Sequence, residues 1–572
     1  CDIVLKTAEN IRDKVFLSEN LTVTVAVLLS FAIGRFVEGV IAILLLQLSY
    51  LVRDYALFKT REMLCRAVEP QRKMLSGLEA GGKGDPEYPV GSTLVAYEGM
   101  ELPVDCVIKE GSGFADLSFI TGSSKKVPLS KGDYVPAGSV CVGGQFLAEA
   151  AQPPEDALYK KMGSLLKTGY GEVTANEIAW GKWTSFFVPA ALIISLILLL
   201  VLPFIFKIDF TETVRRITII IAIASPCGVL LSIPMTYFSS MAAGRSSGVL
   251  FTHAAALDKT AEVKAIVFKK LGTLTDRNYL VTEIKTDKMD QATFLKVAAY
   301  AAVKSKNHLA KAIINAFGEE IDKTLVEKFA EFPDKGISVS IQGIKILLGS
   351  SEFLSENGAN VPSGDAEAGA KLFMSVSGSY AGYITLNETI KPDVSASYFK
   401  TLAKTGADRI VMVSGDSRDR DSLVARELGL DEYYAECPTE EKILRIAEIK
   451  ERIDKKSALA FVGDCESGEK LFEAADVGIL TDGVACAGEL SKADVVIMEN
   501  GIGPLPSAIM LAQKTKHSVA RGSAFVCFIK AVILVLAVLG YAPLWFALLI
   551  DFSAALAAVL SSTGIYTRES KR

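Results

Sequence analysis

Six long apolar stretches constrain this chain more than any other feature. They lie near residues 17–34, 36–55, 183–206, 213–240, 522–541 and 543–562. A helix needs about 20 apolar residues to cross the roughly 30 Å hydrocarbon core of a bilayer. Six buried core helices of this kind would overfill a soluble domain, so the stretches predict membrane spans. Short connections join them in pairs, which predicts three helical hairpins.

The remaining sequence is typical of soluble domains. Hydrophobic residues make up 50% of the chain and charged residues 22%, so the apolar content must be concentrated in blocks. The net charge of −5 gives no indication of a nucleic-acid partner. The nine cysteines contain no CxxC pair, which argues against a disulfide framework and favours a reducing compartment.

Two soluble segments separate the hairpins, and they differ in pattern. The segment after the second span contains "YPVGSTLVAYEGMELPVDCVI", where short alternating runs and turns predict a small all-β domain. In the segment after the fourth span, apolar runs such as "DRIVMVSGD" and "SALAFVGD" alternate with amphipathic helices, which predicts a parallel doubly wound sheet. An excess of basic residues near the spans predicts that these segments lie in the cytoplasm. Arg215 and Arg216 do not follow this distribution of positive charge.

Seven short motifs follow one another in a recognisable order. They are "ADLSFITGSS" (115–124), "SPC" (225–227), "FKKLGTLT" (268–275), "KPD" (391–393), "VSGDS" (413–417), "VGDCESGEKL" (462–471) and "AADVGI" (474–479). Their order and spacing, over essentially the whole chain, resemble the heavy-metal P-type ATPases. The run "GYAPLW" between two charged span residues resembles the zinc/cadmium/lead-exporting type within that family.

The resemblance implies a multidomain membrane protein. It would combine a six-helix transmembrane bundle, an all-β actuator-like domain, and an α/β haloacid-dehalogenase-like phosphorylation domain with an α+β nucleotide-binding-like insertion. The implied bounds are 1–60, 181–250 and 516–572 for the hairpins, 61–180 for the actuator-like domain, 251–276 with 386–515 for the phosphorylation-like domain, and 277–385 for the insertion. A multi-pass protein of the bacterial plasma membrane, with cytoplasmic soluble domains, is the expected setting.

The family's phosphorylation motif is altered at its first position. In the family pattern DKTGTLT the aspartate is phosphorylated, and Lys269 stands in its place. An ammonium cannot form an acyl phosphate, and Asp276 lies beyond the loop. The family's Thr273, Asp416 and Asp464 positions are retained. We expect the Lys269 ammonium to form an ion pair with one of these two carboxylates, where the cation of an intact site would lie.

Other positions of the same reaction cycle are also changed. The family's magnesium motif has lost an amide at Ser467 and a carboxylate at Gly468, and a hard cation held by fewer oxygens binds weakly. Ser123 replaces the actuator glutamate that positions water, which leaves the TGSS run as a plain turn. Lys442 matches the family's phosphate-neutralising lysine, with an ordinary surface lysine as the alternative.

The nucleotide-binding motifs are degraded as well. The family's SEHPL reads "SKNHL" at 305–309, so Asn307 and His308 lie where the adenine-facing pair is expected. The first glycine of the family's GxG is Asp334, and only Gly336 persists. A β-carbon and a negative charge at this position should repel the phosphates of ATP.

The membrane spans retain more of the family's pattern. Pro226 breaks the fourth span beside Cys227, and Ser225 replaces the usual first cysteine. One thiolate still suits Zn²⁺ or Cd²⁺. Lys530 and Asp551 are ionisable residues within spans. Placing such a residue in a bilayer costs free energy, so we interpret both as functional. We expect these two to pair with each other, either as a remnant of a metal site or as a purely structural salt bridge.

The sequence leaves three functional hypotheses. The favoured one is a pseudo-ATPase: a non-pumping membrane partner, regulator or metal-binding protein. The alternatives are an ATP-driven exporter of divalent heavy metals and a passive metal-binding or conducting protein. No cofactor is certain, since the resemblance implies Mg²⁺ and ATP but their sites are degraded. The expected partners are the lipid bilayer, a divalent heavy-metal ion such as Zn²⁺ or Cd²⁺, and an intact pump or regulatory protein, without nucleic acid.

Overall fold

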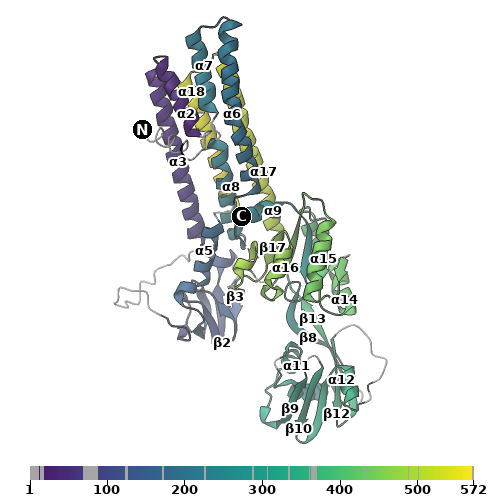
Figure 1. Cartoon of the computed structure of the whole chain (residues 1–572). Helices are drawn as coiled ribbons and strands as arrows, with labels where there is room; N and C mark the ends of the chain where they lie inside the picture. Colours follow the sequence, from purple (N-terminus) through teal and green to yellow (C-terminus); the bar gives the residue numbers. More distant parts are fainter. Residues whose placement is uncertain are drawn as a thin grey trace, which may run out of the picture. The chain divides into compact units, whose positions relative to one another are not determined.

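The computed structural model divides the chain into two compact units (Figure 1). The first consists of Cys1–Val263, Asp482–Asn500 and Pro504–Arg572, and the second of Lys264–Thr481 and Gly501–Gly503. The structure describes Arg12 and residues 19–68, 88–122, 126–169, 173–224, 227–286, 289–305, 307–332, 335–359, 361, 370–430, 432–486, 488–499 and 501–569.

Long helices form a bundle in the first unit (Figure 1). They are α2 (Glu19–Ala32), α3 (Phe36–Val68), α6 (Ala175–Phe204), α7 (Phe210–Ile223), α8 (Cys227–Ser246), α17 (Leu505–Leu539) and α18 (Leu544–Glu569). Within the described residues, three segments are long and apolar enough to cross a membrane: Ala175–Phe204, Leu505–Leu539 and Leu544–Ser561. Leu21–Ala32 and Phe36–Val52 are apolar but shorter.

The predicted fourth span, 213–240, is divided between α7 and α8. α7 ends at Ile223 and α8 begins at Cys227, so the predicted break at Pro226 lies, with Ser225, outside the described residues. The preceding helix, α6, begins at a capping box: Thr174 accepts a hydrogen bond from the Glu177 backbone N–H, and the Glu177 carboxylate accepts one from the Thr174 N–H. The bundle core is aliphatic, with the isoleucines of α7 at its centre.

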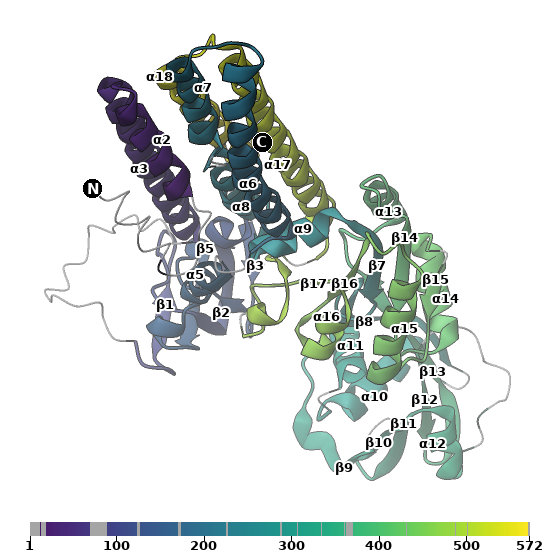
Figure 2. The same ribbon diagram turned by 45° about the horizontal axis from the view of Figure 1, so that its top comes forward.

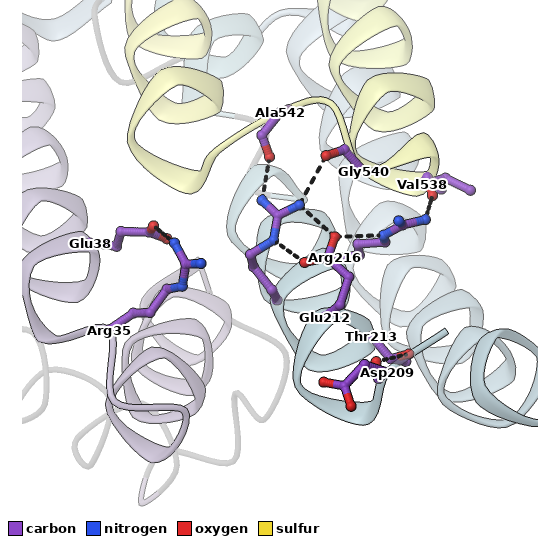
Figure 3. A network of polar contacts seen from close by, with 10 residues as sticks. Arg35, Glu38, Asp209, Glu212, Thr213, Arg216, Val538, Gly540 and Ala542 are labelled. Atoms are coloured by element: carbon purple, nitrogen blue, oxygen red, sulfur yellow. Dashed lines mark hydrogen bonds and ion pairs between the residues drawn. The ribbon is translucent and has the colours of Figure 1, made fainter. Parts of the chain in front are cut away.

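Two arginines at the start of α7 fix the turn between α17 and α18 (Figure 3). Arg215 donates hydrogen bonds to the carbonyls of Gly540 and Ala542, and Arg216 donates one to the carbonyl of Val538. Both guanidinium groups also contact Glu212, at 2.6 and 3.0 Å. Arg216 lies so close to Gly540 that a β-carbon at that position would collide with it.

A small antiparallel domain in the first unit confirms the predicted all-β segment. Its strands are β1 (Thr93–Ala96), β2 (Cys106–Asp116), β3 (Lys126–Leu129), β4 (Tyr134–Val135) and β5 (Val140–Ala150), in the order β1-β5-β2-β3 with β4 paired to β2. Buried Asp105 holds the domain together, since it accepts hydrogen bonds from the Tyr134 hydroxyl and from the Ala137 and Leu158 amides. The helices α4 (Ser118–Thr121) and α5 (Leu158–Gly169) accompany these strands.

The second unit contains the predicted parallel sheet. Its strands are β7 (Val263–Lys269), β14 (Arg409–Val413), β15 (Glu432–Tyr434), β16 (Ala458–Gly463) and β17 (Val477–Leu480). β14 pairs in parallel with both β7 and β15, and β16 pairs in parallel with β17. Every residue of β16 is buried, as expected for a strand covered on both faces. The accompanying helices are α13 (Ala396–Ala403), α14 (Arg418–Leu428), α15 (Thr439–Glu451) and α16 (Glu469–Ala474).

An antiparallel sheet is inserted between β7 and β14. Its order is β8 (Thr275–Thr286), β13 (Ser379–Ile390), β12 (Ala370–Val376), β11 (Ile344–Gly349), β10 (Gly336–Ile341) and β9 (Val326–Phe332). α10 (Gln291–Ala302) and α11 (His308–Phe317) pack on this sheet around the buried Phe294 (Figure 2). α12 (Ser351–Glu356) has a smaller core of its own around Phe353. In the first unit, β6 (Val249–Phe251) pairs with β18 (Val495–Ile497), next to α9 (Ala254–Ala261).

Candidate functional site

The altered phosphorylation motif lies where the parallel strands of the second unit end. Lys269 is the last residue of β7, and Asp464 directly follows β16. Asp416 follows β14 by three residues. The carboxyl ends of parallel strands share one edge of a sheet, which is where open α/β folds bind ligands.

Lys269 and Asp464 form an ion pair. The Lys269 ammonium lies 2.6 Å from Oδ1 of Asp464, with side-chain exposures of 14% and 3%. The Ser467 hydroxyl donates to the same oxygen at 2.9 Å and accepts a hydrogen bond from the Asp464 amide. The ion pair expected from the sequence is therefore present, and Asp464 rather than Asp416 is its carboxylate.

Lys270 forms a second and more deeply buried cluster. Its side chain is 1% exposed, and its ammonium contacts Asp416, Asp421 at 2.9 Å and Glu388 at 3.3 Å. Thr275 donates a hydrogen bond to the Glu388 carboxylate from the start of β8. One buried ammonium thus faces three carboxyl groups.

Burial and charge shift the pKa values of this cluster in different directions. Burial lowers the pKa of Lys270, but the carboxylates outweigh burial and raise it above the ordinary lysine value. Burial alone would raise the pKa of Asp416, and the contact with Lys270 brings it below the ordinary value. The pKa values of Glu388 and Asp421 are raised by burial despite the same lysine. Burial therefore favours the neutral forms of Glu388 and Asp421, whereas Lys270 favours the ionised form of Asp416.

Two further predicted residues lie nearby. Lys442, on α15, lies with its ammonium 3.8 Å from the position that a β-carbon on Gly415 would occupy. Burial and the neighbouring charge of Lys269 lower the pKa of Lys442. Thr273 is fully buried, and its hydroxyl has no hydrogen-bond partner within the described part of the chain.

In the nucleotide-binding-like insertion, the predicted nucleotide-binding residues Asn307 and Gly336 have structural roles. The Asn307 side chain caps α11 by accepting a hydrogen bond from the Leu309 amide. A β-carbon at Gly336 would lie 2.6 Å from the Leu348 carbonyl, so the approach of β10 to β11 requires glycine there. The backbone of His308 begins α11, whereas its side chain and all of Asp334 lie outside the described residues.

The actuator-like turn is described only in part. α4 ends at Gly122 in the left-handed conformation, and a β-carbon there would lie 2.6 Å from the Ser246 carbonyl. Both the left-handed conformation and the close approach therefore favour glycine at this position. Ser123 lies outside the described residues.

The membrane helices bring Lys530 and Asp551 together, as predicted. The Lys530 ammonium on α17 lies 2.6 Å from Oδ1 of Asp551 on α18. It also donates a hydrogen bond to the Ile223 carbonyl, at the end of α7, at 3.1 Å. Cys227 begins α8, but its side chain and all of Ser225 lie outside the described part of the structure.

Comparisons with known proteins agree with this arrangement. Residues 87–167 match the model of the P-type ATPase actuator domain, and residues 263–476 match that of the haloacid dehalogenase-like hydrolases. The chain is 27% identical to a cadmium, zinc and cobalt-transporting ATPase of Bacillus subtilis, over 100% of this chain and 82% of that protein. It is 29% identical to a zinc-transporting ATPase of Synechocystis sp., over 98% of this chain and 78% of that protein.

A solved structure shows the same fold. The crystal structure of a zinc-transporting PIB-type ATPase in an E2.Pi state superposes with a TM-score of 0.64, at 22% identity, over 99% of this chain and 93% of that one. The chain belongs to the heavy-metal P-type ATPase family. The fold class predicted from the sequence is confirmed, and so is the multi-pass integral membrane setting.

Members of the heavy-metal P-type ATPase family use Mg²⁺ and ATP, so the strand ends should be tested for a fit to Mg²⁺. Oδ1 of Asp464, the carboxylate oxygen that contacts Lys269, already accepts hydrogen bonds from the Lys269 ammonium and the Ser467 hydroxyl. Ser467 and Gly468 supply no carboxylate, and no group of three His, Cys, Asp or Glu that could hold a metal exists among the described residues. These residues do not fit a tightly held Mg²⁺.

Reasoning from the sequence missed Glu388 and Asp421 at this site. Asp421 belongs to "DSRDRD", at the start of a helix rich in charges of both signs, where each carboxylate is expected to face solvent. It is nevertheless fully buried against Lys270. Glu388 lies more than 110 residues after Lys270 in sequence, on strand β13 of the insertion's sheet. The one available signal was Lys270 itself, since a lysine at the end of a buried strand requires carboxylate partners.

Proposed function

We propose that this chain is a pseudo-ATPase of the heavy-metal P-type family. It has the architecture of the pumps but forms no aspartyl phosphate, and it acts in the membrane as a non-pumping partner, regulator or metal-binding protein. An intact pump or a regulatory protein is its proposed partner.

The ion pair between Lys269 and Asp464 carries the proposal. At the position of the nucleophile, a carboxylate would attack the γ-phosphate, and a protonated amine has no lone pair for this reaction. The same ammonium occupies the Asp464 oxygen that would otherwise help to hold a divalent cation. Lys269 in place of the family's aspartate would therefore remove the nucleophile and also weaken the binding of the metal.

The metal-binding part of the proposal rests on the membrane helices. The relatives are named for zinc, cadmium and cobalt transport. We propose that this chain binds such an ion at the site formed by Cys227, Lys530 and Asp551 but does not pump it. The Lys530–Asp551 pair supports this proposal because it holds a carboxylate within the bundle beside the break between α7 and α8.

A phosphorylation assay tests the proposal. Purified full-length protein, given γ-phosphate-labelled ATP, Mg²⁺ and Zn²⁺ or Cd²⁺, is expected to form no acid-stable, hydroxylamine-sensitive phosphoenzyme. The Bacillus subtilis relative, prepared in the same way, is the positive control. Lys269→Asp should restore little labelling, because three other changes remain: Leu271 in place of the first threonine of DKTGTLT, Gly468 and Ser123. Labelling of the wild-type chain above background would establish the alternative, an ATP-driven exporter of divalent heavy metals.

A further inference from the structure

One exposed face of α17 changes from cationic to apolar along its length. The face begins with three basic side chains and continues with five large apolar ones, all exposed: Lys514, His517, Arg521, Phe525, Phe528, Val532, Val535 and Leu539. Successive members are three or four residues apart, which places them in a single stripe on the helix. We call this stripe the α17 face.

The lengths of the two parts match the layers of a bilayer. Phe525 and Leu539 are 14 residues apart, which corresponds to about 21 Å at 1.5 Å per residue, most of a roughly 30 Å hydrocarbon core. Lys514 and Arg521 are seven residues apart, about 10 Å, which spans the roughly 5–7.5 Å of one polar headgroup layer. The change from basic to apolar falls within one helical turn, between Arg521 and Phe525.

A shallow hollow lies beside the basic part of the α17 face. It has a volume of about 510 Å³ and is lined by Lys514, His517 and Arg521 together with Ala520 and Ala524. The two alanines leave space next to the helix, and the longer basic side chains surround it. The Arg521 guanidinium folds back toward the His517 carbonyl, at 3.4 Å, and so stays near the hollow.

Lys516 shows that not every basic residue of this segment faces the hollow. It lies between Lys514 and His517 in sequence, but its ammonium is 2.5 Å from Oε1 of Glu262, the residue that follows α9. Its charge is therefore directed toward the protein. This difference provides an internal control.

We propose that the α17 face binds an anionic phospholipid. The phosphate of the headgroup lies in the hollow between Lys514 and Arg521, and an acyl chain follows the apolar stripe from Phe525 toward Leu539. Basic residues next to the membrane attract anionic headgroups, and each contributes appreciably to binding. The continuity of the basic part with the lipid-exposed stripe selects a membrane lipid over a soluble anion. This site is independent of whether the chain hydrolyses ATP.

Lipid retention in native mass spectrometry tests the site. Full-length protein in detergent is offered dioleoyl-phosphatidylglycerol or dioleoyl-phosphatidylcholine, and the apparent affinity of the first bound lipid is compared. Wild type should prefer phosphatidylglycerol, and Lys514→Gln with Arg521→Gln should weaken its binding by about tenfold or more, since each basic residue near the surface is worth about 1 kcal/mol. Phosphatidylcholine binding should not change.

The matched control removes the same charge elsewhere. Lys516→Gln with Lys345→Gln, the second an exposed residue near the start of β11, should keep wild-type lipid binding. The site is refuted if the Lys514/Arg521 variant retains phosphatidylglycerol as wild type does, or if the control variant loses it equally. It is also refuted if glycerol phosphate competes with phosphatidylglycerol at equal concentration, because a soluble anion would then suffice. Should the double variant fail to fold, Arg521→Gln alone is expected to weaken binding about fivefold.

Discussion

The Lys269 ammonium lies 2.6 Å from the Asp464 carboxylate, at the ends of two strands that are nearly 190 residues apart in sequence. Removing one partner of such a pair strands the other charge in a poorly hydrated place. Lys269→Ala should therefore lower the melting temperature of the full-length protein, with a cost of about 3–5 kcal/mol. Mg²⁺ should restore part of the loss by occupying the vacated position.

Lys264 is the matched control for this variant, because it lies on the same strand. Its ion pair with Asp408 is longer, 3.5 Å, and exposed, with side-chain exposures of 47% and 76%. Lys264→Ala should cost less than about 1 kcal/mol and gain nothing from Mg²⁺. Equal losses in the two variants would show that the Lys269 pair is an ordinary surface contact.

Lys270 should be the more sensitive of the two neighbouring lysines. Lys270→Met keeps much of the side-chain volume but leaves Asp416, Asp421 and Glu388 without their shared cation. We expect a loss of at least about 3–5 kcal/mol, or failure to fold in detergent. Adding Asp421→Asn to Lys270→Met should recover part of the loss, because it removes one stranded carboxyl group. Thermal unfolding of the single and double variants measures this coupling.

The carboxyl groups around Lys270 should respond to pH with opposite signs. The pKa of Asp416 is lowered, so its stabilising contribution is present above the unfolded carboxyl pKa and is lost as the pH falls through the folded value. The pKa of Glu388 is raised, so the folded state takes up its proton first and gains stability as the pH falls from neutral toward the unfolded value. As the pH falls, the difference in unfolding free energy between wild type and Asp416→Asn should shrink. The difference between wild type and Glu388→Gln should instead grow as the pH falls from 7 to about 4.5. Parallel slopes for both variants would contradict these assignments.

The membrane pair predicts an unusual effect of removing a charge. A divalent ion at Asp551 must displace the Lys530 ammonium, so Lys530→Ala should strengthen Zn²⁺ or Cd²⁺ binding, while Cys227→Ala or Asp551→Ala should abolish it. Binding to wild type should be weak, at most one ion per chain, and tighter at higher pH, because the thiol must release its proton. Calorimetry on the detergent-solubilised protein measures each affinity. If wild type and Cys227→Ala bind Cd²⁺ equally well, only the structural salt bridge remains.

The sequence predicted those parts of the fold that depend on local pattern. The short strands around Asp105 follow from propensity and hydrophobic periodicity. The partner of Lys269 could be narrowed to Asp416 or Asp464, because both follow strands of the same sheet, and only the structure selects Asp464. The burial of Asp421 could not be predicted, because it depends on how α14 is rotated as it packs beside β15 and α13. That rotation is a tertiary property, and a helix with so many charges carries little hydrophobic pattern to indicate it.

The arginines at the start of α7 have a mechanical consequence. Arg216 binds the last turn of α17 through the Val538 carbonyl, and seven residues later the Ile223 carbonyl accepts a hydrogen bond from Lys530 on the same helix. Two attachments about 10 Å apart prevent α7 from pivoting about either one. As long as both persist, α7 and α17 form one lever, and any tilt of α7 moves the carboxylate of Asp551 with it through Lys530.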